Sequence, residues 1–147
     1  MQDLKQRTCE FALRVIRWTE ALPRNRVGEV IGRQLLRSGT SVGANYRAEC
    51  RAKPNADFIA KLGIVEEELD ESAYWMELRE ETGMMKLEKL QSLKSETDEL
   101  LAIIVTSIKT ARKNRMTTHT RFHIGVAKRL RNSALRIPHS AFVRPRP

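Results

Sequence analysis

Apolar residues recur along this chain at the three- and four-residue spacing of amphipathic helices. The first such stretch spans about residues 3–22, with Asp3 available as an N-terminal cap. Its apolar face holds Leu4, Phe11, Val15, Trp18 and Leu22. The second stretch spans about residues 27–52, and its shared face holds Ile31, Leu35, Ser38, Val42 and Tyr46. Each pattern predicts a helix with one buried side.

Two further stretches follow a break at Pro54, because the residue before a proline disfavours the helical conformation. The third stretch stops at Gly83, a residue suited to end a helix. Its apolar face holds Phe58, Leu62, Val65, Leu69, Ala73 and Met76. The fourth stretch spans about residues 86–113, and its face holds Leu87, Leu90, Leu93, Thr97, Leu100, Ile104, Ile108 and Ala111.

Amphipathic helices joined by connections of only a few residues must alternate in direction. The composition agrees, because seven glycines and five prolines in 147 residues are few for a sheet protein rich in turns. The sequence therefore predicts an all-α protein. We expect an antiparallel up-down four-helix bundle over residues 1–113, followed by a basic C-terminal tail over residues 114–147.

Small residues gather in the middle of the second predicted helix. Glycine inside a helix costs about 1 kcal/mol relative to alanine, so their presence indicates that a neighbouring backbone comes very close. Asn45 is expected to be a buried polar group that fixes helix register. Tyr74 and Trp75 lie at the edge of the third apolar face, where aromatic residues serve either an interface or the core. The expected helix-packing or oligomer contacts are Ser38, Gly39, Val42, Gly43, Asn45, Tyr74 and Trp75.

Charge is distributed unevenly along the chain. The formal net charge is +9, and residues 113–147 account for all of it, with nine Lys or Arg and no Asp or Glu. Residues 24–61 carry eight basic and three acidic side chains, whereas residues 66–81 carry one basic and eight acidic. The candidate nucleic-acid contacts are Arg33, Arg37, Arg47, Arg51, Lys53, Lys61, Arg121, Lys128, Arg129 and Arg131.

Two charged regions have more than one interpretation. The acidic residues 66–71 form either a solvated face or a docking surface for a basic partner, including the arginine face of another copy. The tail is either unstructured or contains a short basic helix of the kind that binds RNA, anionic membranes or an acidic groove. The apolar face of that helix would hold Phe122, Val126, Leu130, Ala134 and Ile137.

The sequence offers little support for catalysis. All three histidines lie in the tail, and no phosphate-binding glycine loop is present, so we expect no enzyme activity, no cofactor and no metal. Cys9 and Cys50 have no metal or redox spacing and are expected to be reduced packing thiols. No apolar run is long enough to span a membrane, and the N-terminus does not have the pattern of a signal peptide, so a cytoplasmic location is expected.

Two segments resemble the four-helix proteins known as 23S rRNA-intervening sequence proteins. These are RSGTSVGANYRAE at residues 37–49 and DFIAKLGIVEEELDESAYWMEL at residues 57–78. The resemblance covers about residues 4–113 and implies an up-down bundle that assembles as a homopentamer without known enzyme activity. A related group, the accessory variability determinant proteins of diversity-generating retroelements, forms basic pentamers that bind nucleic acid and a reverse transcriptase. The tail has no counterpart in the family.

Two hypotheses for function follow. In the first, the chain is a self-associating bundle that contacts RNA or DNA through its basic residues without reading base sequence. In the second, it is an adaptor or accessory subunit that docks on a partner enzyme such as a reverse transcriptase without touching nucleic acid. The neutral charge of residues 1–112 favours the adaptor, whereas the clustering of basic residues favours nucleic-acid binding.

Overall fold

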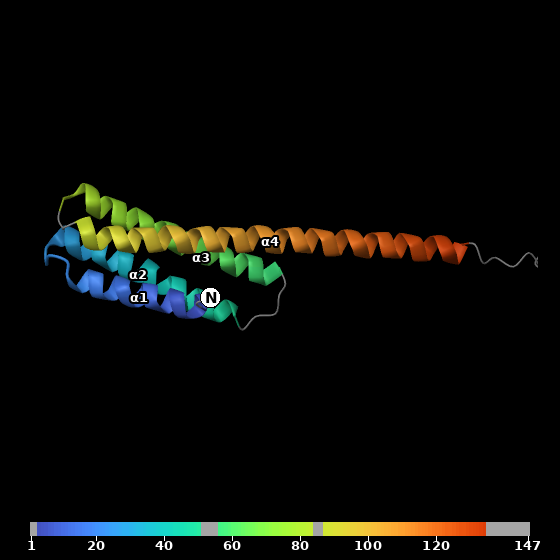
Figure 1. Cartoon of the computed structure of the whole chain (residues 1–147), viewed down its shortest axis with the longest axis horizontal. Coiled ribbons are helices and arrows are strands. Elements are labelled where there is room, and N and C mark those ends of the chain that lie inside the picture. Colours follow the sequence, from blue (N-terminus) through green and yellow to red (C-terminus); the bar gives the residue numbers. More distant parts are fainter. Residues whose placement is uncertain (1–2, 51–55, 84–86, 135–147) are drawn as a thin grey trace, which may run out of the picture. The chain divides into compact units, whose positions relative to one another are not determined.

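The computed structural model describes residues 3–50, 56–83 and 87–134 of the chain, with side chains for residues 3–50, 58–83 and 90–117. Every regular element in these ranges is helical, which confirms the all-α prediction. The helices are α1 (Leu4–Glu20), α2 (Arg26–Glu49), α3 (Ala56–Glu81) and α4 (Leu87–Ala134), shown in Figure 1. The chain divides into two units, residues 1–110 and residues 111–147.

Local side-chain and backbone chemistry sets three of the helix ends. The Asp3 carboxylate accepts a hydrogen bond from the Lys5 N–H at 3.1 Å, and the Asn25 side chain accepts one from the Gly28 N–H at 2.8 Å. Gly83 follows α3 with a φ of +62°, a backbone conformation that favours glycine. Its N–H donates to the Glu80 carbonyl oxygen at 3.0 Å. The prediction that α3 stops at Gly83 is therefore confirmed.

The last helix is longer than the apolar pattern predicts. The pattern ends near Lys113, whereas α4 continues to Ala134. The reason lies in the backbone preferences of the intervening residues, because the first proline after α3 is Pro138 and Gly125 is the one glycine in this stretch. A helix needs no apolar stripe to continue through such residues.

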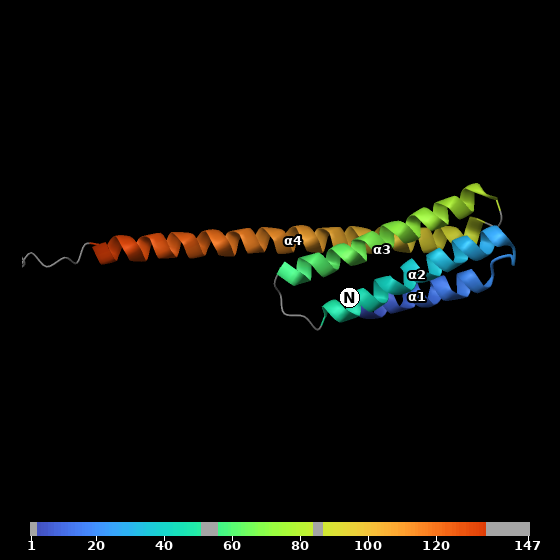
Figure 2. The same ribbon diagram turned by 180° about the vertical axis from the view of Figure 1, so that it is seen from behind.

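Successive helices of the first unit are neighbours and run in opposite directions, as Figures 1 and 2 show. Polar contacts join α2 to α3 through Ser38 and Ser72, and α3 to α4 through Glu80 and Lys94. α1 and α4, the first and last helices, are also neighbours, because Arg7 of α1 donates to Glu96 of α4 at 2.7 Å. This arrangement confirms the antiparallel four-helix bundle.

The bundle core consists of the predicted apolar faces. Its buried side chains are Phe11, Val15, Trp18, Leu35, Val42, Leu62, Val65, Leu69, Met76, Leu90, Leu93, Leu100, Ile104 and Ile108. Tyr46 and Phe58 are partly buried and pack against this cluster. On α3 the buried position is Ser72, whereas Ala73, which the pattern included, is only partly buried. The core therefore follows the predicted stripes with a shift of one residue at this point.

The small residues of α2 lie where α1 comes close. A Cβ atom at Gly39 would lie 2.8 Å from Val15 Cγ2, and one at Gly43 would lie 3.2 Å from the Thr8 carbonyl oxygen. Neither space accommodates a larger side chain without movement of the neighbour. The predicted close approach of a second backbone is therefore confirmed at Gly43.

Two smaller expectations need correction. Asn45 is partly buried, so it is not the fully buried polar group that its position suggested. Cys9 and Cys50 are both free but exposed, because they fall outside the apolar faces of their helices. Their packing role was predicted wrongly. None of the described helices is long and apolar enough to cross a membrane.

Candidate functional site

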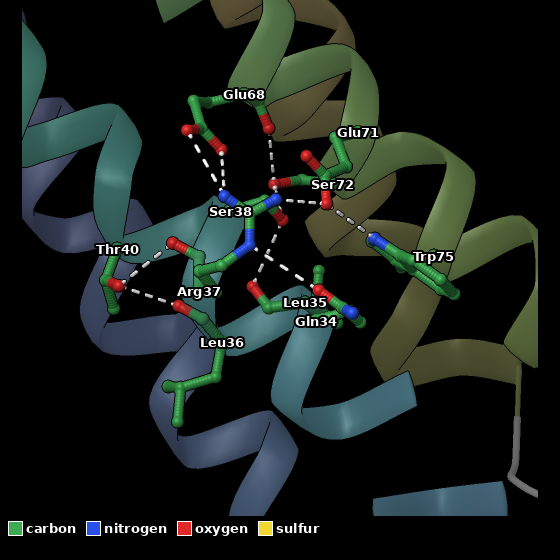
Figure 3. Close-up of polar contacts among 10 residues, drawn as sticks. All are labelled: Gln34, Leu35, Leu36, Arg37, Ser38, Thr40, Glu68, Glu71, Ser72 and Trp75. Atoms are coloured by element: carbon green, nitrogen blue, oxygen red, sulfur yellow. Dashed lines mark hydrogen bonds and ion pairs between the residues drawn. The ribbon is translucent and has the colours of Figure 1, made fainter. Parts of the chain in front are cut away.

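The main polar cluster of the described residues lies between α2 and α3, on the outside of the bundle. Arg37 projects from α2 toward α3 and donates from Nη1 to both carboxylate oxygens of Glu68, each at 3.5 Å. Its Nη2 forms a second ion pair with Glu71. Figure 3 shows the guanidinium between these two carboxylates. One arginine therefore bridges two acidic residues of the neighbouring helix.

Glu71 connects this arginine to an aromatic pair. The Trp75 Nε1–H donates to Glu71 Oε1 at 3.0 Å (Figure 3). The Trp75 ring meets the Tyr74 ring edge-on, with centroids 5.2 Å apart and an interplanar angle of 65°. Such an arrangement is favourable for aromatic rings. Trp75 packs partly into the core, while Tyr74 is exposed.

Two buried hydroxyl groups lie at the same helix interface. Ser38 and Ser72 are fully buried, and their Oγ atoms are 2.9 Å apart. Ser38 Oγ also lies 3.4 Å from the Leu35 carbonyl oxygen, and Ser72 Oγ lies 2.8 Å from the Glu68 carbonyl oxygen. Both hydroxyls are thus satisfied within the protein, and the pair has no free reactive group. We interpret it as a packing contact, as predicted for Ser38.

The pKa values of this cluster show how the charges interact. The hydrogen bond from Arg37, followed by that from Trp75, lowers the pKa of Glu71. Burial raises the pKa of Glu68, and this effect outweighs the attraction of Arg37. The hydrogen bond to Glu71 raises the pKa of Arg37 above its usual range. Arg37 therefore stabilises the ionised form of Glu71 more effectively than that of Glu68.

The predicted basic residues of α2 do not form one free cationic surface. Arg33 and Arg47 are exposed, but the charge of Arg37 is balanced by two carboxylates of its own chain. Lys61 on α3 is partly buried, whereas Arg51 and Lys53 lie outside the described residues. Arg33 and Arg47 are also separated by 14 residues, or about 21 Å along a helix. The basic residues of α2 therefore offer fewer free cations for binding an anion than the sequence predicted.

A second group of basic residues lies on the C-terminal part of α4. We call residues 111–134 the basic segment, because they contain seven Lys or Arg and no Asp or Glu. Arg112, Lys113 and Arg115 are exposed. Arg121, Lys128, Arg129 and Arg131 lie on the same helix, but their side chains fall outside the described part.

Sequence reasoning omitted Arg112, Lys113 and Arg115 from the candidate contacts. It placed Arg112 and Lys113 at the end of the fourth predicted helix and Arg115 in the basic tail, without naming any of them as a contact. The signal that identifies them is the absence of acidic residues after Glu99. No group of three or more metal-ligating side chains occurs among the residues that the structure describes.

Most of the chain matches the model of a known protein family. The family model of the 23S rRNA-intervening sequence protein matches residues 2–106. The chain belongs to this family. The match ends before the basic segment, so residues 107–147 of this family member lie outside the matched region.

A solved structure supports the same assignment. This family member is similar to a protein of unknown function from the S23 ribosomal protein family of Bacteroides thetaiotaomicron VPI-5482. The two share 36% sequence identity with a TM-score of 0.68, and the similarity covers 73% of this chain and 99% of the other. Comparison with curated proteins gives no match.

Proposed function

We propose that this member of the 23S rRNA-intervening sequence protein family is a non-catalytic, self-associating bundle that binds nucleic acid through its basic segment. The observation that carries the proposal is the charge of that segment: seven Lys or Arg and no acid on a helical stretch outside the family match. Exposed Arg112, Lys113 and Arg115 offer cations that no acidic side chain of the same segment neutralises. Arg33 and Arg47 supply secondary contacts.

The expected mechanism is contact with phosphate groups. Lys and Arg side chains that neutralise phosphates release counterions, so the affinity falls steeply as the salt concentration rises. The chain has no known motif for reading bases, and we therefore expect little dependence on nucleic-acid sequence. RNA and DNA of the same length are both suitable probes.

Fluorescence anisotropy of labelled RNA and DNA with the full chain, at several salt concentrations, tests this function. The test variant carries Arg112→Gln, Lys113→Gln and Arg115→Gln. The control variant carries Lys5→Gln, Arg17→Gln and Arg24→Gln, which are exposed positions of the bundle and change the net charge equally.

We expect the test variant to bind at least about tenfold more weakly, with a salt slope shallower by up to about three phosphate contacts. The control variant should stay close to the wild type. Equal losses in both variants would assign binding to net charge alone. No binding by the wild-type chain would overturn the proposal.

Self-association is the second part of the proposal, and the family resemblance leads us to expect a homopentamer. Sedimentation velocity should then give a mass five times the 16.9 kDa of one chain. A monomer at all concentrations would contradict this expectation.

Docking on a protein is a second candidate function. The observation that favours it is the presence of large apolar side chains on the surface, including Leu13, Leu36, Ile64 and Tyr74. An adaptor should still bind its protein partner when Arg112, Lys113 and Arg115 are replaced by glutamine. A purified partner enzyme that binds this variant as well as the wild type would therefore favour the adaptor function.

A further inference from the structure

α3 carries a second regular stripe on its solvent-exposed side. We call it the outer stripe, and it consists of Ile64, Glu67, Glu71, Tyr74, Leu78 and Glu81, spaced by three and four residues. Ile64 is 43% exposed and Tyr74 is 52% exposed. The stripe therefore holds three apolar side chains and three glutamates on one side of the helix, a surface that complements a partner with both apolar and cationic groups. Glu71 lies at the edge of this face and pairs with Arg37 of α2, whereas Ile64, Glu67, Tyr74 and Glu81 are exposed.

The exposed Tyr74 ring lies between a second aromatic ring and a surface hollow. Its ring rests edge-on against Trp75, whose indole packs against the core and donates to Glu71. Beside it is a hollow of about 400 Å³, lined by Tyr74, Glu77, Leu78, Glu80, Glu81 and Lys94. A ring that is already packed on one side loses less conformational freedom when it binds a partner.

The charges of this face call for a cationic partner. Exposed Glu67 and Glu81 form no ion pair with the described residues, whereas Glu77 already interacts electrostatically with Lys94. Their neighbours are already paired, since Glu71 contacts Arg37 and Glu80 contacts Lys94. An arginine beside Tyr74 would also gain a cation–π contact with the exposed ring.

The chain itself contains a helix of the matching chemistry. The basic segment has seven cationic residues and no acid, and Arg112, Lys113 and Arg115 are exposed around Met116, which is 72% exposed. We infer that the outer stripe of α3 is the docking site for the basic segment of a second copy of this chain. The carboxylates pair with the arginines and lysines, while Ile64, Tyr74 and Leu78 contact the apolar parts of the segment.

This contact is heterologous, because it joins two different surfaces: the outer stripe of one copy and the basic segment of another. Docking itself does not depend on nucleic acid. A regulatory consequence rests on the proposed function: phosphates and the outer stripe compete for the same cations. Nucleic acid should then release the segment from the neighbouring copy.

Photo-crosslinking of the full chain tests the docking. Tyr74→p-benzoylphenylalanine places a photoreactive ring on the outer stripe, and Leu13→p-benzoylphenylalanine, at an exposed position of α1, is the control. Copies labelled with ¹⁵N are mixed with unlabelled copies under reducing conditions, so that mass spectrometry distinguishes crosslinks between copies from those within one copy.

We expect position 74 to crosslink to residues 111–134 of the other copy, and position 13 not to do so. The Arg112→Gln, Lys113→Gln, Arg115→Gln variant should lower the yield at least about threefold, whereas the Lys5→Gln, Arg17→Gln, Arg24→Gln variant should not. Circular dichroism checks that each variant is folded. Crosslinks only within one copy, to the bundle of the other copy, or with unchanged yield in the first variant would overturn the docking.

Adding RNA to the same mixture separates the two proposals. Loss of the crosslink supports competition for the basic segment. A crosslink that persists while RNA is bound would keep the docking and overturn the assignment of phosphate contacts to this segment.

Discussion

At the scale of residues, Arg37 lies between two carboxylates whose pKa values move in opposite directions. The pKa of Glu71 is lowered because Arg37 and Trp75 donate to its carboxylate. Ionised Glu71 therefore stabilises the folded protein at pH values above the usual pKa of a carboxyl group. This stability is lost as the pH falls through the lowered pKa. The pKa of Glu68 is raised by burial, so its ionisation costs stability at neutral pH, and the cost disappears as the pH falls through the raised pKa.

A substitution of the arginine separates these effects. Arg37→Gln should raise the pKa of Glu71 toward its ordinary value and the pKa of Glu68 still further, because both carboxylates lose their cation. The protein should also lose less stability when it is acidified, since ionised Glu71 then keeps only the hydrogen bond from Trp75 and contributes less. NMR titration of the side-chain carboxyl carbons measures both values.

Arg33→Gln is the matched control, because Arg33 is exposed one helical turn away on α2. It should leave the two pKa values nearly unchanged. Equal shifts in both variants would mean that net charge, rather than the contact seen between the helices, sets these values.

At the scale of elements, two glycines in different surroundings should respond oppositely to substitution. Gly43→Leu places a side chain against the Thr8 backbone and should lower the free energy of unfolding by about 1–3 kcal/mol. Gly63→Ala fills open space in α3, where a new Cβ meets nothing within 4 Å. It should raise that free energy by up to about 1 kcal/mol.

Urea denaturation of the two variants gives these values directly. A Gly43→Leu protein as stable as the wild type would contradict the close approach of α1 and α2. A loss of stability in Gly63→Ala would mean that α3 is covered at this position.

The helices and the core could be predicted from the sequence because both follow from spacing within one helix. Stripes such as Leu62, Val65 and Leu69 need no knowledge of the neighbouring helix. The pairing of Arg37 with Glu68 and Glu71 does need it, since it depends on how α2 and α3 are aligned. Sequence reasoning therefore identified Arg37 as cationic but not that its charge is already balanced.

The end of α4 illustrates a different limit. Apolar periodicity marks where a helix is buried, not where it ends, so the stripe that stops near Ala111 gave too short a helix. The positive charge of the proposed nucleic-acid contacts could be predicted from the sequence. The exposure of Arg112, Lys113 and Arg115 was found only in the structure.

At the scale of the whole molecule, the buried core and the excess of basic over acidic residues occupy different parts of the sequence. Every side chain of the core cluster lies between Phe11 and Ile108. A chain that ends at Arg112 should therefore unfold at nearly the same urea concentration as the full chain. It should bind RNA and DNA far more weakly, because it lacks the nine Lys and Arg of residues 113–147.

Denaturation and anisotropy of the same two proteins check both expectations. A large loss of stability on truncation would show that the C-terminal residues belong to the folding unit. Unchanged binding would transfer the phosphate contacts to Arg33, Arg47 and the rest of the bundle.

The exposed thiols of Cys9 and Cys50 affect how such assemblies can be measured. A chain with two accessible thiols can form a disulfide to each of two neighbours, so air oxidation would produce covalent strings of copies with no fixed length. Without a reductant, the measured size would then depend on how far these disulfides had formed during storage and not on the association equilibrium. The same thiols are natural attachment points for maleimide fluorophores, one on α1 and one at the end of α2, without any change to the sequence.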